Sequence, residues 1–295
     1  MRKTCFSYLL LLSILLSPLA HAGLASLFAP KAELWAVWQP HNEQNTTKID
    51  HSTWDAFLSK HVVSGKDGIN RIAYASVSDA DKQMLADYLQ RMQGIAISQY
   101  SHAEQKAYWA NLYNAATVNV VLQHYPVKSI RDIDISPGFF ADGPWGKKLL
   151  TIENRQVSLN DIEHRIIRPI WHDNRMHYAL NCASLGCPNL QKHAFHADTM
   201  DTVLDQAARD YINHPRGARF KDGELYVSSI YNWFQADFGG SDAGVIAHLK
   251  KYASDKLAAR LAKVSQISGD DYNWALNDVS AEKTKVQTDA EDELQ

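Results

Sequence analysis

The chain has 295 residues, 45% of them hydrophobic, which is enough apolar material for one large domain or two small ones with a real core. With 33 acidic against 30 basic residues, its formal net charge is −3 at pH 7. A net negative charge does not attract phosphate groups, so the composition argues against nucleic-acid binding and against binding to anionic membrane surfaces.

The N-terminus has the three parts of a secretory signal peptide. Arg2 and Lys3 form a basic start, residues 9–19 form an apolar run, and Ala20-His21-Ala22 places small residues at the cleavage positions. The apolar run is too short for a permanent bilayer span. We therefore expect residues 1–22 to be removed, no integral membrane segment after cleavage, and a periplasmic or secreted protein.

The rest of the chain is expected to contain one main unit. Residues 23–50 lack a periodic pattern and are predicted to be an irregular lead-in. Residues 51–279 are predicted to form a single globular domain, beginning with helices over 52–63 and 78–92. Residues 280–295 have no large apolar cluster and are predicted to be a disordered tail.

The clearest helix is predicted to begin after Ser101 and to end near His124. Ser101 and Glu104 have the spacing of a capping box, and a proline follows the predicted end of the helix. Residues 107–122 contain no charged side chain. A helix that is apolar all round is buried, so this segment is expected to be the central helix of the core.

Two amides on this helix, Asn111 and Asn114, would be buried with it. Buried amides must find hydrogen-bond partners. They are expected either to tether the helix to neighbouring loops or to form a wall of the functional site.

A hairpin is predicted over residues 149–157, and a helix capped by Ser158 and Asp161 follows it. On a helical wheel Glu163 falls inside the apolar stripe of this helix. That stripe contains Leu159, Ile162, Ile166, Ile167 and Ile170. Because a carboxylate on an apolar face is costly unless it is paired, we expect Glu163 to be buried and to have a dedicated partner.

Residues 175–181 are predicted to form a strand. Alternation places His177 and Asn181 on one face and Cys182 on the other. His177 is therefore the expected partner of Glu163, within hydrogen-bond reach directly or through one group. The same alternation separates His177 from Cys182 unless the strand ends before the cysteine.

The mature chain would keep two cysteines, Cys182 and Cys187. An exported protein meets an oxidising compartment, where an even number of thiols suggests a disulfide. Because the enclosed loop is short, this bridge would stabilise the fold by only about 2 kcal/mol. Its main effect would be to fix the shape of the loop.

The C-terminal third is predicted to alternate helices with short strands, which gives an α+β fold: a helix-rich single domain with a small, mostly antiparallel sheet. The predicted elements are an amphipathic helix over 198–213, a hairpin over 219–227, a short helix over 229–234, a helix from Ser241 to Tyr252, a helix over 255–262 and a strand over 272–276.

Several motifs in order resemble the domain-of-unknown-function family 547, in its exported bacterial branch. The matching segments are residues 108–115, 157–164, 177–184, 186–188, 237–240 and 272–277. The family has no established activity, so the resemblance implies positions of interest and not their roles. These positions are Asn111, Asn114, Glu163, His177 and Cys182.

The first functional hypothesis is a binding domain for an unknown small molecule or protein. A Cys182–Cys187 disulfide would fix the loop, and aromatic side chains of residues 139–145 and 231–234 would line a groove. The binding or structural network would consist of Glu163, His177, Asn111, Asn114, Asn181 and Ser184. A scaffold or assembly role is a further possibility.

The alternative is a hydrolase or acyl transferase. Cys182 would be the nucleophile, His177 or His193 the base, and Glu163 or Asn181 the orienting group. A variant without the thiol would use His177 and Glu163 as an acid/base pair.

Other motifs carry no further function. Histidines are dense around residues 164–196, but none has the spacing of a zinc site, so no metal is expected. The sequence has no nucleotide-binding fingerprint, and no cofactor is expected. Asp237-Phe238-Gly239 is interpreted as the end of one helix followed by the cap of the next.

Overall fold

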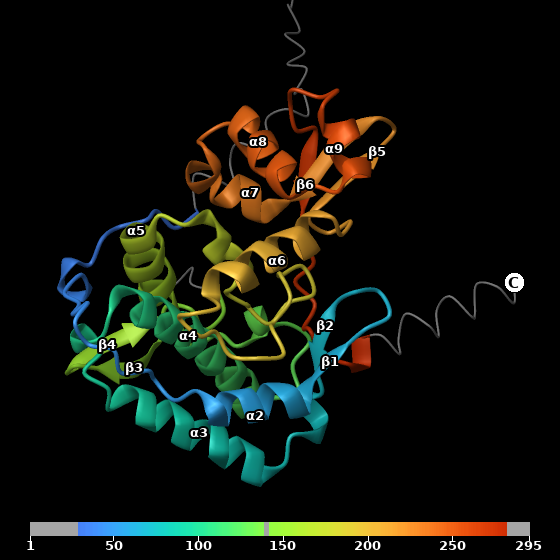
Figure 1. Ribbon diagram of the computed structural model, residues 1–295. Helices are drawn as coiled ribbons and strands as arrows, with labels where there is room; N and C mark the ends of the chain where they lie inside the picture. Colours follow the sequence, from blue (N-terminus) through green and yellow to red (C-terminus); the bar gives the residue numbers. More distant parts are fainter. Residues whose placement is uncertain (1–28, 139–141, 282–295) are drawn as a thin grey trace, which may run out of the picture.

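The computed structural model describes residues 29–138 and 142–281 (Figure 1). The predicted signal peptide lies outside the described residues, as does nearly all of the predicted tail. Helices dominate the described part and the sheets are small, so the expected α+β class is confirmed. Two hydrophobic clusters fill the interior, one built mainly from residues 38–204 and the other mainly from residues 207–261.

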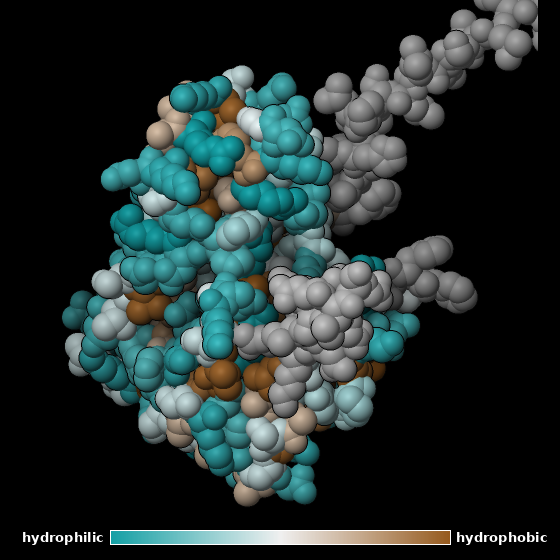
Figure 2. Space-filling model, turned by 90° about the vertical axis from the view of Figure 1, so that its right-hand side faces the viewer, coloured by the Kyte–Doolittle hydropathy of each residue, from teal (hydrophilic) through white to brown (hydrophobic). Residues whose placement is uncertain are grey.

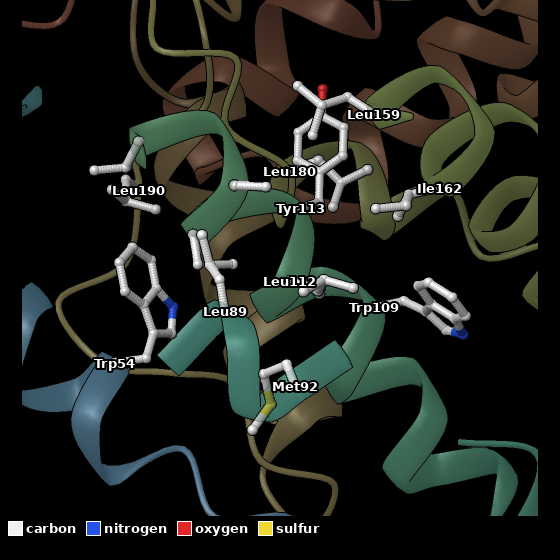
Figure 3. Packing of buried hydrophobic residues seen from close by; sticks show 14 of the residues in the cluster. Trp54, Leu89, Met92, Trp109, Leu112, Tyr113, Leu159, Ile162, Leu180 and Leu190 are labelled. Carbon is white, nitrogen blue, oxygen red and sulfur yellow. The ribbon is translucent and has the colours of Figure 1, made fainter. Parts of the chain in front are cut away.

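The first cluster is organised around helix α4, which matches the predicted central helix. The elements before and including it are η2 (Ala36–Trp38), α2 (Ser52–His61), β1 (Val62–Ser64), β2 (Asn70–Ile72), η3 (Tyr74–Ser76), α3 (Asp79–Gln93), η4 (Ile97–Gln99) and α4 (His102–His124). Trp54 of α2, Leu89 of α3 and Leu112 of α4 belong to this cluster, and Trp109 lies on the side of α4 away from Trp54 (Figure 3). The uncharged stretch of α4 is buried over almost its whole length, as expected of a helix that is apolar all round.

The start of α4 differs in one detail from the predicted capping box. The Ser101 side chain accepts a hydrogen bond from the Glu104 N–H at 3.3 Å, as predicted. The Glu104 carboxylate does not return to Ser101 but accepts from the Ile49 N–H at 3.2 Å. This acid therefore pins the lead-in segment to the core.

A hairpin follows, formed by β3 (Lys148–Ile152) and β4 (Arg155–Ser158). Its two turn residues, Glu153 and Asn154, have φ of 45° and 64°, the left-handed region that a tight two-residue hairpin turn requires. Ser158 and Asp161 cap each other's backbone N–H groups at 2.8 and 3.2 Å, so both halves of this predicted capping box are present. The next elements are the π-helix η6 (Asp161–Ile167) and α5 (Arg168–Trp171).

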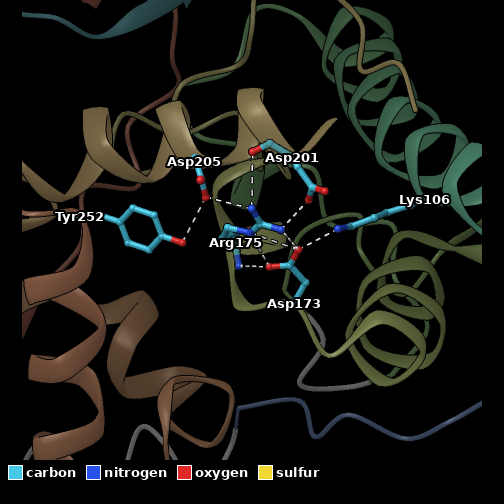
Figure 4. Close-up of polar contacts among 6 residues, drawn as sticks. All are labelled: Lys106, Asp173, Arg175, Asp201, Asp205 and Tyr252. Atoms are coloured by element: carbon cyan, nitrogen blue, oxygen red, sulfur yellow. Dashed lines mark hydrogen bonds and ion pairs between the residues drawn. The ribbon is translucent and has the colours of Figure 1, made fainter. Parts of the chain in front are cut away.

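The predicted strand over residues 175–181 is wrong. This segment contains the 3-10 helix η7 (Asn174–Tyr178). Asp173 caps it by accepting the Arg175 N–H at 3.0 Å, and the same carboxylate binds the Arg175 guanidinium (Figure 4). Such local side-chain bonds offer the backbone an alternative to an extended strand, and here they override the alternating pattern.

The remaining elements are α6 (Met200–Ile212), β5 (Ala218–Lys221), β6 (Glu224–Ser228), α7 (Ser229–Trp233), η8 (Gln235–Phe238), α8 (Asp242–Tyr252), α9 (Asp255–Leu261) and β7 (Gly269–Asp271). The second cluster lies in what we call the C-terminal lobe, formed by β5, β6, α7, α8 and α9 at the top of Figure 1, with α6 beneath it. β5 and β6 are antiparallel, and β7 joins β6 in parallel, so the sheets are mostly antiparallel as predicted.

The last strand is displaced from its predicted position. β7 precedes residues 272–276, and within that range only Leu276 forms an isolated bridge, with Ser184. We call residues 269–279 the closing segment. Its backbone makes hydrogen bonds to Ile72 and Lys128 of the first half of the chain. It also bonds to Ala183 in residues 182–187, which we call the cysteine loop.

The surface shown in Figure 2 is largely hydrophilic, with small separate hydrophobic patches both in its upper part and in its lower half. Across residues 29–138 and 142–281, no helix has both the length and the apolar character that crossing a membrane requires.

Candidate functional site

A pocket of about 700 Å³ lies between the first cluster and the C-terminal lobe. It brings together side chains of α4, η6, η7, the cysteine loop, α7 and the closing segment. Its wall contains three of the positions that the family resemblance singled out, namely Glu163, His177 and Cys182. The pocket is therefore the candidate functional site.

Glu163 lies half-buried at the pocket wall and is not enclosed in the core. The Tyr113 hydroxyl donates to its Oε2 at 3.0 Å. Burial and the adjacent carboxylate raise the pKa of Tyr113 well above its usual value, so the hydroxyl keeps its proton and donates. Oε1 of Glu163 has no hydrogen bond within the described residues and is not among their enclosed polar atoms, so it is open to the pocket.

The prediction for Glu163 is thus half right: it has a dedicated partner, but the partner is a tyrosine and the carboxylate faces a cavity. The reason is local. The helical wheel assumed α-helical geometry, whereas residues 161–167 form a π-helix, whose wider turns rotate side chains away from their α-helical positions.

His177 pairs with Asp237, and the predicted hydrogen bond to Glu163 is not made. Its Nε2 lies 2.7 Å from Oδ2 of Asp237, which also accepts from Nε of Arg168 at 2.6 Å. Burial alone would raise the pKa of Asp237, but the hydrogen bonds from His177 and Arg168 outweigh it and lower the pKa well below its usual value. The imidazole also stacks on Phe234, with ring centroids 4.6 Å apart.

This arrangement fixes how His177 faces the pocket. Because Nε2 contacts a carboxylate, it carries the proton and donates. Nδ1 has no partner within the described residues and is not an enclosed atom, so it is available to a ligand.

A second histidine, His164, also lines the pocket but is held neutral. Burial lowers its pKa to about 4. Nη1 of Arg168 lies 3.0 Å from its Nδ1 and donates to it, which leaves the proton on Nε2. Arg168 therefore supports both pocket histidines, one directly and one through Asp237.

Cys182 and Cys187 also line the pocket, with their sulfur atoms 2.7 Å apart. This exceeds the length of a disulfide, about 2.05 Å, and both cysteines are free thiols in the structure. Sγ of Cys187 accepts the Cys182 N–H at 2.9 Å. The predicted proximity is present, but the predicted bond itself is not.

The environment of Cys182 is hydroxyl-rich. Its sulfur lies 3.0 Å from the Tyr272 hydroxyl and 3.3 Å from that of Ser184, and no imidazole of the described residues contacts it. Burial and the neighbouring Cys187 raise the pKa of the Cys182 thiol well above its usual value. A thiol in this setting stays protonated, unlike an activated nucleophile.

The predicted amide positions hold the site without lining it. Asn114 donates to the Ala179 carbonyl and accepts the Asn181 N–H, both at 2.8 Å. Asn111 makes the same two-way contact with the backbone of Phe195, at 2.8 and 2.9 Å. Asn114 thus tethers α4 to the segment that carries Leu180 and Cys182 of the pocket, whereas Asn111 tethers α4 to a loop outside the pocket. Neither amide lines the pocket.

Asn181 and Ser184 shape the cysteine loop. Oδ1 of Asn181 accepts the Ala183 N–H at 2.9 Å, and its Nδ2 donates to the Pro188 carbonyl at 2.8 Å. The Ser184 hydroxyl donates to that of Tyr272 at 2.9 Å. These bonds explain how a loop containing Ala183 at φ 57° is held in place.

One side of the pocket is aromatic. Trp233 stacks with Trp274 at 5.6 Å between ring centroids and contacts Tyr272 at 4.9 Å. Trp145 meets Trp274 edge-on at 5.8 Å. The expectation that residues 139–145 and 231–234 supply groove aromatics thus has a counterpart in Trp145 and in Trp233 with Phe234, while residues 139–141 lie outside the described part.

His193 and His196 do not line the pocket. Both contact Asp55, at 3.5 and 3.3 Å, on a largely exposed loop. In the described part of the chain, no three His, Cys, Asp or Glu side chains are placed to hold a metal ion together.

Sequence reasoning missed four residues of this site: Tyr113, Arg168, Asp237 and Tyr272. The motif of Asp237 is one of the segments that carry the family resemblance, but its local pattern predicts only the end of a helix. Tyr113 and Tyr272 also lie in such segments. The pairing of Asp237 with a histidine 60 residues earlier has no local sequence signal.

The fold and pocket define a helix-rich α+β protein with a polar and aromatic cavity. Residues 97–212 match the family described as "Protein of unknown function, DUF547", which confirms the resemblance drawn from the motifs over this segment. No curated protein and no solved structure matches the chain.

Proposed function

We propose that this protein is an exported binding domain, periplasmic or secreted, whose pocket accepts a small molecule or a segment of a protein partner. The observation that carries the proposal is the pocket of about 700 Å³ in which unengaged polar atoms face an aromatic wall. Cavities of this size with a few placed polar groups among apolar side chains are typical of ligand sites.

Two polar atoms of the pocket wall lack a hydrogen-bond partner in the described residues: Oε1 of Glu163 and Nδ1 of His177. The other polar atom of each side chain is bonded, Oε2 of Glu163 to Tyr113 and Nε2 of His177 to Asp237. Two polar atoms that are held in place and lack hydrogen-bond partners can both bond to one ligand in the pocket.

Export and a disulfide belong to the same proposal. The signal-like N-terminus supports export, and the 2.7 Å separation of the two sulfurs supports a Cys182–Cys187 disulfide in an oxidising compartment. That bond would fix the loop that contributes both cysteines to the pocket wall.

The test is saturation-transfer NMR with a mixed set of aromatic alcohols, amines and acids on the mature chain. Trp233→Ala removes part of the pocket wall, and Trp171→Ala is the matched control because Trp171 does not line the pocket. Binding that is lost in the first variant and kept in the second supports the proposal. If no probe shows this dependence, the proposal fails.

The second candidate is acid–base catalysis of the hydrolase or acyl transferase type, favoured by the His177–Asp237 pair. A carboxylate that accepts from Nε2 orients the imidazole and leaves Nδ1 as a base facing the pocket. The thiol version has less support because the contacts of Cys182 are hydroxyls and a second thiol.

This second candidate predicts turnover of p-nitrophenyl acetate that is lost in both His177→Asn and Asp237→Asn. His193→Asn is the control, since His193 lies outside the pocket. Equal rates in all variants would exclude an acid–base role for His177 toward this ester.

A further inference from the structure

The charges on the pocket wall are not balanced. Arg131 forms an ion pair with Asp142, so these two charges cancel. His164 lines the pocket as a neutral imidazole. Glu163 is the remaining acid of the wall, and its one hydrogen bond comes from a neutral hydroxyl. No cation of the described residues pairs with it.

The groups behind the wall do not supply the missing charge. Arg168 and Asp237 pair with each other at 2.6 Å, and Arg168 is almost fully buried. Lys148 and Arg165 both bind Asp161, which lies on the same π-helix as Glu163. None of these cations contacts Glu163, so within the described residues its carboxylate faces the cavity without an ion-pair partner.

The aromatic side of the pocket already attracts cations. The Arg131 guanidinium lies over the Trp274 ring at 5.4 Å, and that of Arg168 over Phe234 at 4.6 Å. Within the described residues no cation lies over Trp233 or Tyr272, which are part of the same wall. The two rings pack on each other and on Trp274, and both also line the pocket, so their pocket-facing parts can make a cation–π contact with a ligand.

Resting on the proposed binding function, we infer that the pocket selects ligands carrying an alkylammonium group, whose charge pairs with Oε1 of Glu163 while the adjoining carbon atoms pack on Trp233 and Tyr272. An anionic ligand would meet the Glu163 carboxylate without an unpaired cation to offset it. A neutral ligand would leave that carboxylate without a partner of opposite charge.

The experiment compares three probes of one shape: benzylamine, benzyl alcohol and benzoate. Each is titrated into ¹⁵N-labelled mature protein while the tryptophan indole signals are followed by NMR. We expect benzylamine to bind about tenfold more tightly than benzyl alcohol, and benzoate to bind more weakly than either.

The variants identify the residue. Glu163→Gln keeps an acceptor for the Tyr113 hydroxyl but removes the charge, and it should abolish the preference for benzylamine. Tyr113→Phe keeps the charge and should keep the preference. Glu224→Gln is the matched control, because it removes the same charge from the exposed first residue of β6, outside the pocket.

A pair of dipeptide amides, one with a free and one with an acetylated amino terminus, separates two sources of the same ammonium chemistry. Tighter binding of the free form assigns the site to amino termini of peptides, whereas binding of benzylamine alone assigns it to small amines. Either result supports the inference when it depends on Glu163.

Two failures can be told apart. If benzylamine and benzyl alcohol bind equally, or if the preference survives in Glu163→Gln, the ammonium assignment is overturned while the pocket remains a binding site. If no probe shows binding that is sensitive to Trp233→Ala, the proposed function fails and this inference fails with it.

Discussion

Replacing Asn114 by alanine should destabilise the protein far more than its single side chain suggests. The amide is 2% exposed and satisfies two backbone groups on another segment, the Ala179 carbonyl and the Asn181 N–H. Alanine leaves both groups buried without a partner. Each unsatisfied group costs about 1–3 kcal/mol, so we expect a loss of about 2–6 kcal/mol in the free energy of unfolding.

The same helix offers a matched control. Asn119 is half-buried and makes no side-chain hydrogen bond within the described residues. Asn119→Ala removes an amide of the same size from α4 without leaving a backbone group unpaired. Its cost should stay within about 0.5 kcal/mol.

The assay is urea unfolding of the mature chain, followed by tryptophan fluorescence and by far-ultraviolet circular dichroism, with the slope of the transition checked between variants. The tethering role is refuted if the free energies of unfolding of Asn114→Ala and Asn119→Ala differ by less than about 1 kcal/mol with an unchanged slope. This threshold is about the contribution of one hydrogen bond.

Three further predictions concern stability. Asp173→Asn should cost about 2–4 kcal/mol at neutral pH, because it breaks the contacts of this carboxylate with Arg175. The pKa of Asp173 is lowered in the fold, so this difference should be present above about pH 4 and fade as the pH falls further, which unfolding curves at several pH values would check. Burial lowers the pKa of His248 to about 4, so the unfolded chain takes up a proton first as the pH falls. Stability should therefore drop between about pH 6.5 and 4, and the same series in His248→Gln should be flatter; an equal slope would contradict this. If Cys182 and Cys187 are bridged in the exported protein, the intact mass will rise by two hydrogens on reduction, and an unchanged mass would refute the bridge. Cys187→Ser should lower the free energy of unfolding by about 2 kcal/mol, and reductant should lower that of the wild type by the same amount.

The parts of the fold that could be predicted from sequence are those set by local patterns. The uncharged run of residues 107–122 predicted a buried central helix, because burial of such a segment follows from its composition alone. The Ser158–Asp161 spacing predicted a reciprocal cap, and the structure contains it. The positions singled out by the family resemblance did include three residues that line the pocket.

The predictions were wrong where distant residues or local side-chain hydrogen bonds determine the backbone conformation or the partner of a side chain. The strand predicted over 175–181 is a 3-10 helix because Asp173 captures the backbone at its start. That error carried over to His177, whose face and partner were derived from strand alternation. Its partner in the structure is Asp237 of η8, and no sequence pattern near either residue predicts this pairing.

The arrangement of the pocket wall could not be predicted, although Trp145, Trp233 and Phe234 lie in the segments expected to supply groove aromatics. Its wall combines a tyrosine from α4, a carboxylate turned outward by a π-helix, and aromatic side chains of the closing segment. Each of these depends on how elements pack in three dimensions. Helical-wheel reasoning found the right acid but placed it in the wrong surroundings.

The closing segment has a consequence for how the chain is made. Ile72 exchanges backbone hydrogen bonds with residues near position 278, and Tyr74 donates to Asn277, 203 residues further along. A polypeptide growing on the ribosome cannot form these bonds until almost its entire length has been synthesised. Contacts between residues so remote in sequence form slowly. Ile72 and Tyr74 therefore stay without these partners until synthesis is nearly complete.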